Sequence, residues 1–207
     1  AGAARLEALV NALVFERVIV PIDVEPDPRV TGVHAGDSGH NPIDFVRVQT
    51  PAGEALAIYS SVRALSAHRP GDRPMALDFR TIGLTALIET GGRVVVNPGT
   101  DAVLLPRPAV AALAQGDQWL PAWRDVALRD LLFDEANAVC SAITDLSITY
   151  AGGGLTRVIV SVERSCFTGA ANASAMKQSL TQALSHVGAN RRLIASADRV
   201  EIAPILV

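Results

Sequence analysis

Turn-forming residues interrupt this chain so often that it has to fold from short helices and short strands. Glycine and proline break the pattern at 51–53, 70–72, 91–92, 97–99 and 152–154. Between the breaks, apolar residues repeat at helical spacing, as in residues 4–15, or at every second position, as in residues 155–163. Because both periods occur along the chain, the sequence predicts an α+β fold.

The first half predicts helices and strands in alternation. A helix over 4–15 precedes a strand over 17–24, and a hairpin joins strands 45–50 and 54–60 through Pro51-Ala52-Gly53. Further elements follow as a helix over 61–68 capped by Ser60 or Ser61, a strand over 75–79, a helix over 81–89, a strand over 93–96 and a helix over 108–114.

The second half predicts the order α-β-β-α-β. The helices cover 128–143 and 171–187, with Gly188 ending the second, and the strands cover 147–150, 155–163 and 200–205. Glycines 152–154 read as the turn of a hairpin. We expect a small antiparallel sheet with helices on one face.

These elements predict two small modules, each a mostly antiparallel or mixed β-sheet with helices packed on it. We place the N-terminal module at residues 1–116 and the C-terminal α-β-β-α-β module at 128–207. Residues 117–127 form the linker and contain both tryptophans, Trp119 and Trp123. Amphipathic rings suit half-exposed positions, so we expect the pair to lie in the seam between the two halves.

The composition argues against nucleic acid and membranes as binding partners. The net charge of -3 offers no broad attraction for nucleic acid or anionic lipid, and only 4% aromatic residues leaves few platforms for stacking bases. No apolar run approaches the roughly 20 residues of a membrane span. Two cysteines, Cys140 and Cys166, do not make a disulfide scaffold, so we expect a cytoplasmic protein.

Several motifs resemble the SseB-like family. They are YSS at 59–61, in the place of the family's FTS, TALIETGG at 85–92, and VVVNPG at 94–99 before LLPRPAVAALAQG at 104–116. The closing RVEIAPI at 199–205 is similar to the C-terminal module of that family. The resemblance implies two modules and no catalytic residue, because the motifs are short and the family is not known as an enzyme family.

The first candidate site is the turn at 97–101. Pro98 followed by Gly99 predicts a type II turn after Asn97, at the end of a buried strand. The amides of Gly99 and Thr100 could cradle an anion, with Asp101 beside them. The alternative is a turn with a structural role only.

Two other candidate sites contain reactive or metal-binding residue types, but no sequence motif supports them. His34, Asp37 and His40 are suitable ligands for a divalent ion, but the glycine-rich segment 31–44 also reads as a solvated loop. Cys166 precedes a helix whose N-terminus favours a thiolate, but an isolated cysteine after a strand is more often a small buried hydrophobe.

We therefore expect a non-enzymatic interaction or regulatory protein with an unidentified protein partner and no cofactor or bound metal. Its predicted contacts are Asn97, Pro98, Gly99, Thr100, Asp101, Trp119 and Trp123. Two alternatives stay open: a small-molecule or anion sensor that binds between the modules, and a metal-dependent hydrolase that uses His34, Asp37 and His40. The sequence also leaves homodimerisation through a strand edge open.

Overall fold

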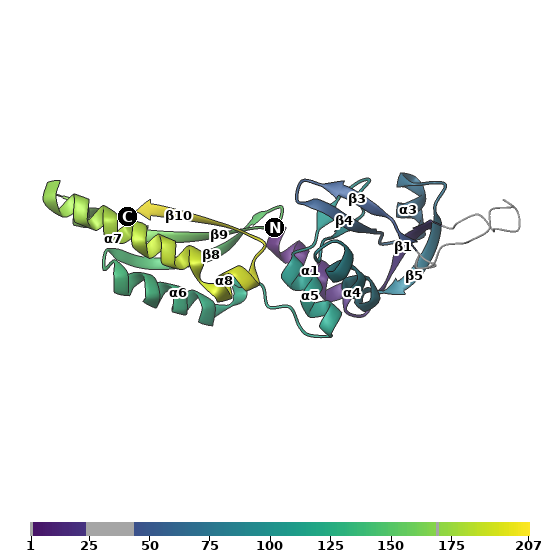
Figure 1. Cartoon of the computed structure of the whole chain (residues 1–207), viewed down its shortest axis with the longest axis horizontal. Coiled ribbons are helices and arrows are strands. Elements are labelled where there is room, and N and C mark those ends of the chain that lie inside the picture. The colour runs from purple at the N-terminus through teal and green to yellow at the C-terminus, as the bar shows by residue number, and fades with distance from the viewer. Residues whose placement is uncertain (1, 24–43, 169) are drawn as a thin grey trace, which may run out of the picture. The chain divides into compact units, whose positions relative to one another are not determined.

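The structure is a computed structural model, and it describes residues 2–23, 44–168 and 170–207. Helices and strands are mixed throughout, which confirms the α+β class (Figure 1). In chain order they are α1 (Gly2–Leu13), β1 (Arg17–Asp23), β2 (Asp44–Phe45), β3 (Arg47–Thr50), β4 (Gly53–Ile58), α3 (Val62–His68), β5 (Arg73–Asp78), α4 (Phe79–Glu89), β6 (Val94–Val96), β7 (Val103–Leu104), α5 (Arg107–Gln115), η1 (Ala122–Arg124), α6 (Val126–Val139), β8 (Ile143–Gly152), β9 (Leu155–Val162), η2 (Arg164–Phe167), α7 (Ala170–Ala189), α8 (Arg191–Ser196) and β10 (Arg199–Leu206).

The chain divides into two compact units. The N-terminal unit is Ala8–Asp117, and the C-terminal unit is Gln118–Val207 together with Ala1–Glu7. The sequence analysis assigned the first seven residues to the N-terminal module instead. Their apolar pattern is continuous with the rest of α1, so nothing local to the sequence separates them from Ala8 onward.

The N-terminal unit contains two sheets. One has the strand order β2-β1-β5, with β1 antiparallel to both neighbours, and the other has the order β3-β4-β6-β7. The predicted hairpin is confirmed, because β3 and β4 pair antiparallel from Arg47↔Leu56 to Thr50↔Gly53. The two-residue strand β7 was not predicted, since Val103 and Leu104 are too few to show a period.

Strands β4 and β6 are parallel, in register from Leu56↔Val94 to Ile58↔Val96. The crossover between them contains α3, β5 and α4, which is long enough to return the chain to the starting end of the sheet. Their carboxyl ends therefore meet at one edge, where Tyr59 follows β4 and Asn97 follows β6. In open α/β sheets this edge is where ligands usually bind.

Local signals account for the helices of this unit. Ser61 caps α3, as predicted, by accepting a hydrogen bond from the amide of Ala64 at 3.1 Å. Pro108 lies in the first turn of α5, and Gly116 ends that helix with a left-handed φ of 83°. Helix α4 begins at Phe79, two residues before the predicted start, because Asp78 ends β5 without an intervening loop.

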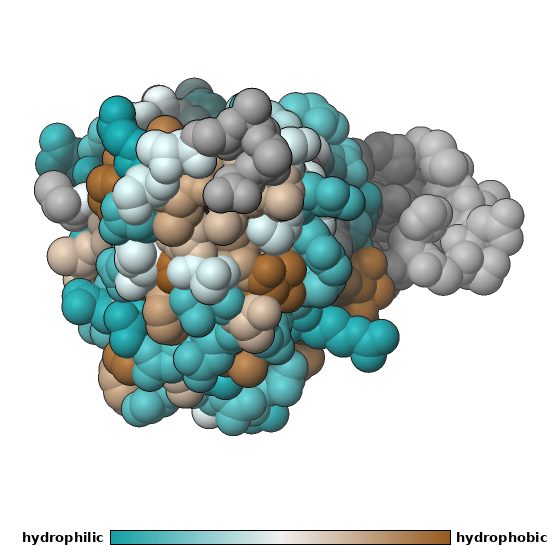
Figure 2. Space-filling view, turned by 90° about the vertical axis from the view of Figure 1, so that its left-hand side faces the viewer, coloured by the Kyte–Doolittle hydropathy of each residue, from teal (hydrophilic) through white to brown (hydrophobic). Residues whose placement is uncertain are grey.

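The C-terminal unit has one sheet with the order β10-β9-β8. Every second residue of β9 is buried, and these side chains pack with Leu132 of α6 and with Ala183 and Val187 of α7. This unit's core is aliphatic, as the composition indicates. At the end of β10, Ile205, Leu206 and Val207 are about half exposed, and Figure 2 shows brown and tan residues near the middle of this end within a ring of teal.

Three predictions for this unit were wrong in detail. Strand β10 pairs with β9 in parallel, because α7 and α8 carry the chain back along the sheet before β10 begins. Helix α6 ends at Val139 rather than Ile143, which instead begins β8. Gly188 does not end α7, which continues to Ala189, and Asn190 then caps the unpredicted helix α8.

Among the described residues, no helix combines the length and the apolar character that a bilayer crossing requires.

Candidate functional site

Two of the motifs that resemble the SseB-like family meet at the carboxyl ends of β4 and β6. The side chain of Asn97, in the NPG motif, accepts a hydrogen bond from the Ser60 amide at 3.0 Å and donates one to the Ser60 hydroxyl at 3.1 Å. The amide of Asn97 also donates to the Ile58 carbonyl at 2.8 Å. These bonds tie the turn after β6 to the end of β4, across 37 positions of sequence.

The turn at 97–100 differs from the predicted type II turn. The amide of Thr100 donates to the carbonyl of Asn97 at 3.2 Å, so the four-residue turn forms. A type II turn requires a positive φ at Gly99, but the positive φ belongs to Asn97, at 50°. Asparagine tolerates this left-handed conformation better than most residues, and here its hydrogen bonds to Ser60 hold it there.

Gly99 is required for space, because it lies against the ring of His68. A Cβ built at Gly99 would come within 2.3 Å of His68 Cγ and 2.6 Å of His68 Cβ. Such distances leave no room for any side chain. The glycine of the NPG motif therefore allows the last residue of α3 to pack directly on the turn.

The other side of the imidazole meets Tyr59, whose hydroxyl lies 2.8 Å from His68 Nδ1. Only 1% of Tyr59 is exposed, and this burial raises the pKa of its phenol above the ordinary value. The phenol therefore stays protonated at neutral pH. His68 is thus held between a buried hydroxyl on one side and the Gly99 backbone on the other.

A pocket of about 380 Å³ opens beside this turn. Its lining residues come from β3 and its following turn, from α3, from β6 and from the segment that leads into β7: Val48, Gln49, Thr50, Pro51, His68, Val95, Pro98, Ala102 and Leu104. Its walls are mostly aliphatic. Among the described residues that line it there is no Asp, Glu, Lys or Arg, and His68 is the titratable side chain.

The valine and leucine residues that line the pocket lie on one face of the four-stranded sheet. Val95 is in register with Ala57 on one side and Leu104 on the other, so their side chains share one face of the sheet. Val48 is in register with Ala55, two positions before Ala57 and on the same face. Ala55 and Ala57 are themselves buried, so the pocket lining comes from the strands on either side of β4.

The predicted contacts at the turn occupy different positions around this pocket. Pro98 lines it, whereas Gly99, Thr100 and Asp101 are exposed. The predicted anion site on the amides of Gly99 and Thr100 is only partly available, because the Thr100 amide already donates to Asn97. His68 and Tyr59 were not singled out from the sequence. The sequence signal that could have found them is their spacing around α3: Tyr59 lies two positions before the Ser61 cap, and His68 is the last residue of the helix.

Trp119 and Trp123 form an aromatic cluster within the C-terminal unit. Their rings meet edge to face with centroids 5.6 Å apart, and Trp123 lies 5.0 Å from Tyr150. Trp119 Nε1 is buried, and no described residue accepts its proton. The position of the pair between the two halves stays a prediction.

Glu7 joins this cluster from the first turns of α1. Trp123 Nε1 donates to Glu7 Oε1 at 2.6 Å, and Arg124 lies 3.2 Å from the same carboxylate. The hydrogen bond from Trp123, helped by Arg124, outweighs burial and lowers the pKa of Glu7 from its usual value. Trp123 therefore has a partner for its polar atom, which makes it less available as a contact for another protein.

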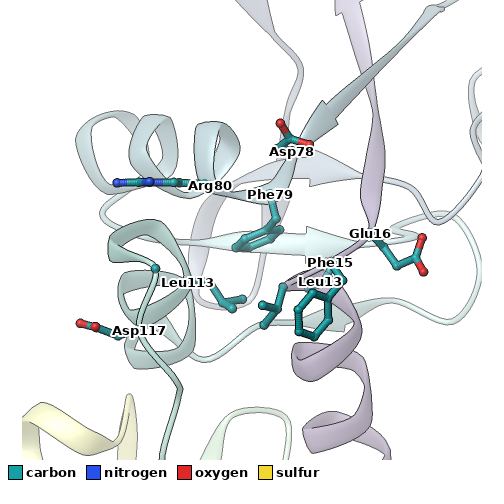
Figure 3. A pocket seen from close by; sticks show the side chains of 10 residues that line it. Leu13, Phe15, Glu16, Asp78, Phe79, Arg80, Leu113 and Asp117 are labelled. Carbon is teal, nitrogen blue, oxygen red and sulfur yellow. The ribbon is translucent and has the colours of Figure 1, made fainter.

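A second, smaller pocket of about 170 Å³ lies between the end of α1 and helices α4 and α5 (Figure 3). Leu13, Phe79 and Leu113 converge on it, while Arg80 and Asp117 point away from its apolar centre. Arg80 instead donates to the carbonyl of Ala114 at 3.2 Å. At under half the volume of the His68 pocket, this one resembles a packing defect beside the exposed Phe15 more than a binding site.

The remaining candidates are not brought together with the turn. His34, Asp37 and His40 lie outside the described residues, so the metal-dependent alternative stays a prediction. Within the described part of the chain, no three His, Cys, Asp or Glu side chains are grouped so that they could hold a metal ion. Cys140 is buried and Cys166, in η2, is half-buried; both are free thiols.

Comparison with known proteins identifies the N-terminal part. The model of the SseB protein N-terminal domain matches residues 1–112 of the 207, and this range includes Tyr59, Asn97 and the whole His68 pocket. No curated protein and no solved structure matches the chain. The similarity of 199–205 to the C-terminal module lies beyond the matched range and stays a prediction. Because the match covers more than half of the chain, this protein belongs to the SseB family.

Proposed function

We propose that this chain is a non-enzymatic interaction or regulatory protein that contacts a protein partner through the turn surface, defined as Asn97–Asp101. The observation that supports this most directly is the bracing of the turn. The side chain of its first residue is hydrogen-bonded to the amide and the hydroxyl of Ser60, the amide of that residue donates to the Ile58 carbonyl, and its glycine packs on His68. The exposed residues of the turn are thereby held in one conformation.

A braced surface loop suits recognition for an energetic reason. Ordering a loop on binding costs free energy, and a loop that is already ordered avoids that cost. Thr100 and Asp101 are exposed, so a partner can reach them. The neighbouring pocket adds an apolar surface on which a partner can gain contact area.

The aromatic cluster is the second surface we considered. Trp119 and Trp123 are the kind of side chain that dominates binding energy at interfaces. Both rings are half-buried and already pack on each other, and Trp123 also packs on Tyr150. We therefore favour the turn surface. We place the interaction in the cytoplasm, where Cys140 and Cys166 would remain reduced thiols.

The test is site-specific photocrosslinking in native cytosol. A photoreactive phenylalanine analogue replaces Thr100 in one protein and, in a matched control, Thr81, an exposed threonine on α4 of the same unit. We expect a discrete crosslinked partner from position 100 and none from position 81. The captured partner is then purified, and its affinity for the Thr100→Arg and Thr81→Arg variants is measured.

Thr100→Arg is expected to weaken binding of the purified partner at least about fivefold, which corresponds to about 1 kcal/mol, the loss that marks a substantial interface contact. Thr81→Arg should leave the affinity unchanged. Circular dichroism must show both variants folded. The proposal is overturned if position 100 captures nothing, or if both positions capture the same proteins.

A further inference from the structure

We propose that the His68 pocket binds a small, uncharged aliphatic compound that carries a carbonyl-type hydrogen-bond acceptor, and that His68 Nε2–H donates to that acceptor. This binding goes beyond the proposed function and does not depend on it. It rests on three features of the N-terminal unit: the proton arrangement of His68, the chemistry of the pocket walls and the contacts that hold the imidazole in place.

The buried phenol of Tyr59 determines which imidazole nitrogen carries the proton. A buried hydroxyl needs an acceptor for its proton, and His68 Nδ1, at 2.8 Å, is the acceptor that the described residues provide. Tyr59 therefore donates to Nδ1. In a neutral imidazole the remaining proton is then on Nε2, on the side of the ring away from Tyr59. His68 lines the pocket, and Nε2–H is the N–H group that the bond to Tyr59 leaves available to a ligand.

The walls select an occupant without charge. Val48, Val95 and Leu104 form an aliphatic face, and two prolines, Pro51 and Pro98, have no amide proton to offer. Among the described residues, no Asp, Glu, Lys or Arg side chain lines the pocket, so a charged group placed in it would lose hydration without a permanent opposite charge in return. The volume of about 380 Å³ falls in the range typical of small-molecule sites.

The donor is also fixed in place before any ligand arrives. Gly99 contacts the imidazole at Cγ and Cδ2 while Tyr59 holds Nδ1, so the ring cannot turn freely. The pocket extends from Thr50 and Pro51, beside the start of β4, to Pro98 in the turn after β6. A preorganised donor in an apolar pocket gives orientation to a ligand that the walls alone would hold loosely.

The test uses nuclear magnetic resonance on the isotope-labelled full chain with three small probes. Isovaleramide has the aliphatic group and the acceptor, acetamide has the acceptor alone, and isoamylamine has the aliphatic group with a positive charge and no acceptor. We expect isovaleramide to shift the amide signals of Val95 and Gly99 saturably, and the other two probes not to do so at the same concentration. The side-chain nitrogen shifts of His68 should report the Nε2–H tautomer.

Matched variants locate the binding. Ala102 is exposed and lines the pocket, so Ala102→Trp should fill it and abolish the shifts without disturbing the core. Ala76→Trp, at an exposed alanine of β5, is the control and should bind isovaleramide like the parent. His68→Phe keeps a ring but removes the donor, and should weaken isovaleramide about fivefold, the worth of one hydrogen bond.

Equal shifts from isoamylamine, no shift from isovaleramide, or an Nδ1–H tautomer would each overturn the proposal. One further outcome separates it from the proposed function. If isovaleramide fails to bind while Ala102→Trp weakens the partner captured at Thr100, then the pocket takes a partner side chain, and the small-ligand proposal is wrong although the interaction function stands. If isovaleramide binds but position 100 captures no partner, the reverse conclusion holds.

Discussion

Two glycine-containing turns in this molecule need glycine for opposite reasons. In the hairpin between β8 and β9, Gly152, Gly153 and Gly154 have φ values of 94°, 56° and 77°, and a Cβ added at any of them would meet no atom within 4 Å. At the end of β6, Gly99 has no left-handed φ, but a Cβ would collide with His68 at 2.3 Å. The first turn needs a special backbone, and the second needs empty space.

The two uses of glycine distinguish a turn that only joins two strands from a turn that packs against a distant segment. A two-residue hairpin with both central φ values positive is the form that matches the twist of two antiparallel strands, so the glycines at 153 and 154 serve the chain reversal alone. The glycine at 99 serves contact between segments far apart in sequence. A family motif that preserves space, rather than backbone freedom, indicates that something is positioned there, and in this protein it is the His68 imidazole.

The largest effect should come from Gly99→Ala. The clash includes His68 Cβ at 2.6 Å, which no rotation of the imidazole relieves, so the turn and the end of α3 must move apart. Overpacking, together with loss of the buried bond between Tyr59 and His68, should lower the free energy of unfolding by about 3 kcal/mol, measured by urea denaturation.

A double-mutant cycle checks the cause. In a His68→Gly background the same Gly99→Ala change should cost under about 1 kcal/mol, because both the colliding ring and the His68 Cβ are gone. An equal loss in both backgrounds would mean that Gly99 is needed for its backbone after all, and the contrast between the two turns would disappear.

Asn97→Ala should have the second largest effect, about 2 kcal/mol, since alanine bears the cost of a left-handed φ and also loses the bonds to Ser60. Asn97→Gly keeps the backbone conformation at no cost and loses only the bonds, so it should cost about 1 kcal/mol. The difference in unfolding free energy between the two variants, measured by chemical denaturation, gives the cost of the left-handed backbone conformation alone. If the two variants are equally stable, φ at position 97 is unimportant.

Gly153→Ala should cost about 1 kcal/mol, the usual cost of a left-handed φ for a residue with a Cβ. Gly153→Asn should recover part of that loss, because asparagine tolerates this conformation. Thermal unfolding of both variants and of the parent protein measures these two differences in stability. A loss for Gly153→Ala as large as that for Gly99→Ala would show that the hairpin turn also packs against something.

Thr100→Ala should have the smallest effect on folding, within about 0.5 kcal/mol, as is usual at exposed positions. Its effect should appear in the affinity of the partner captured at position 100 instead. A clear loss of stability by urea denaturation would assign Thr100 to the fold and weaken its place in the proposed contact surface.

Sequence patterns predicted those parts of the fold that depend on neighbours along the chain. The amphipathic period of α1, the Ser61 cap of α3, and the hairpins at 51–53 and 152–154 are local features, and each lies where it was expected. The turn at 97–101 was also singled out, from a proline and a glycine after a buried strand. Its type was wrong, because Pro-Gly alone suggests a positive φ at the glycine.

Other features were decided only between distant segments. The parallel pairing of β10 depends on where α7 and α8 return the chain, and a strand's own residues do not encode its direction relative to a neighbour. The His68 pocket brings together residues from 48 to 104, of which only Pro98 had been marked as a contact. No periodic pattern in the sequence predicts that these residues line one pocket.

The sequence by itself therefore determined the class of fold, most of the elements and the family motifs, because each depends on residue type and short-range spacing. The tertiary structure decided which segments the motifs bring into contact. It brought Ser60 to Asn97 and His68 to Gly99 across the ends of two parallel strands. The physical reason is that a site is made of distances between segments, and those distances exist only after the crossover between β4 and β6 has folded.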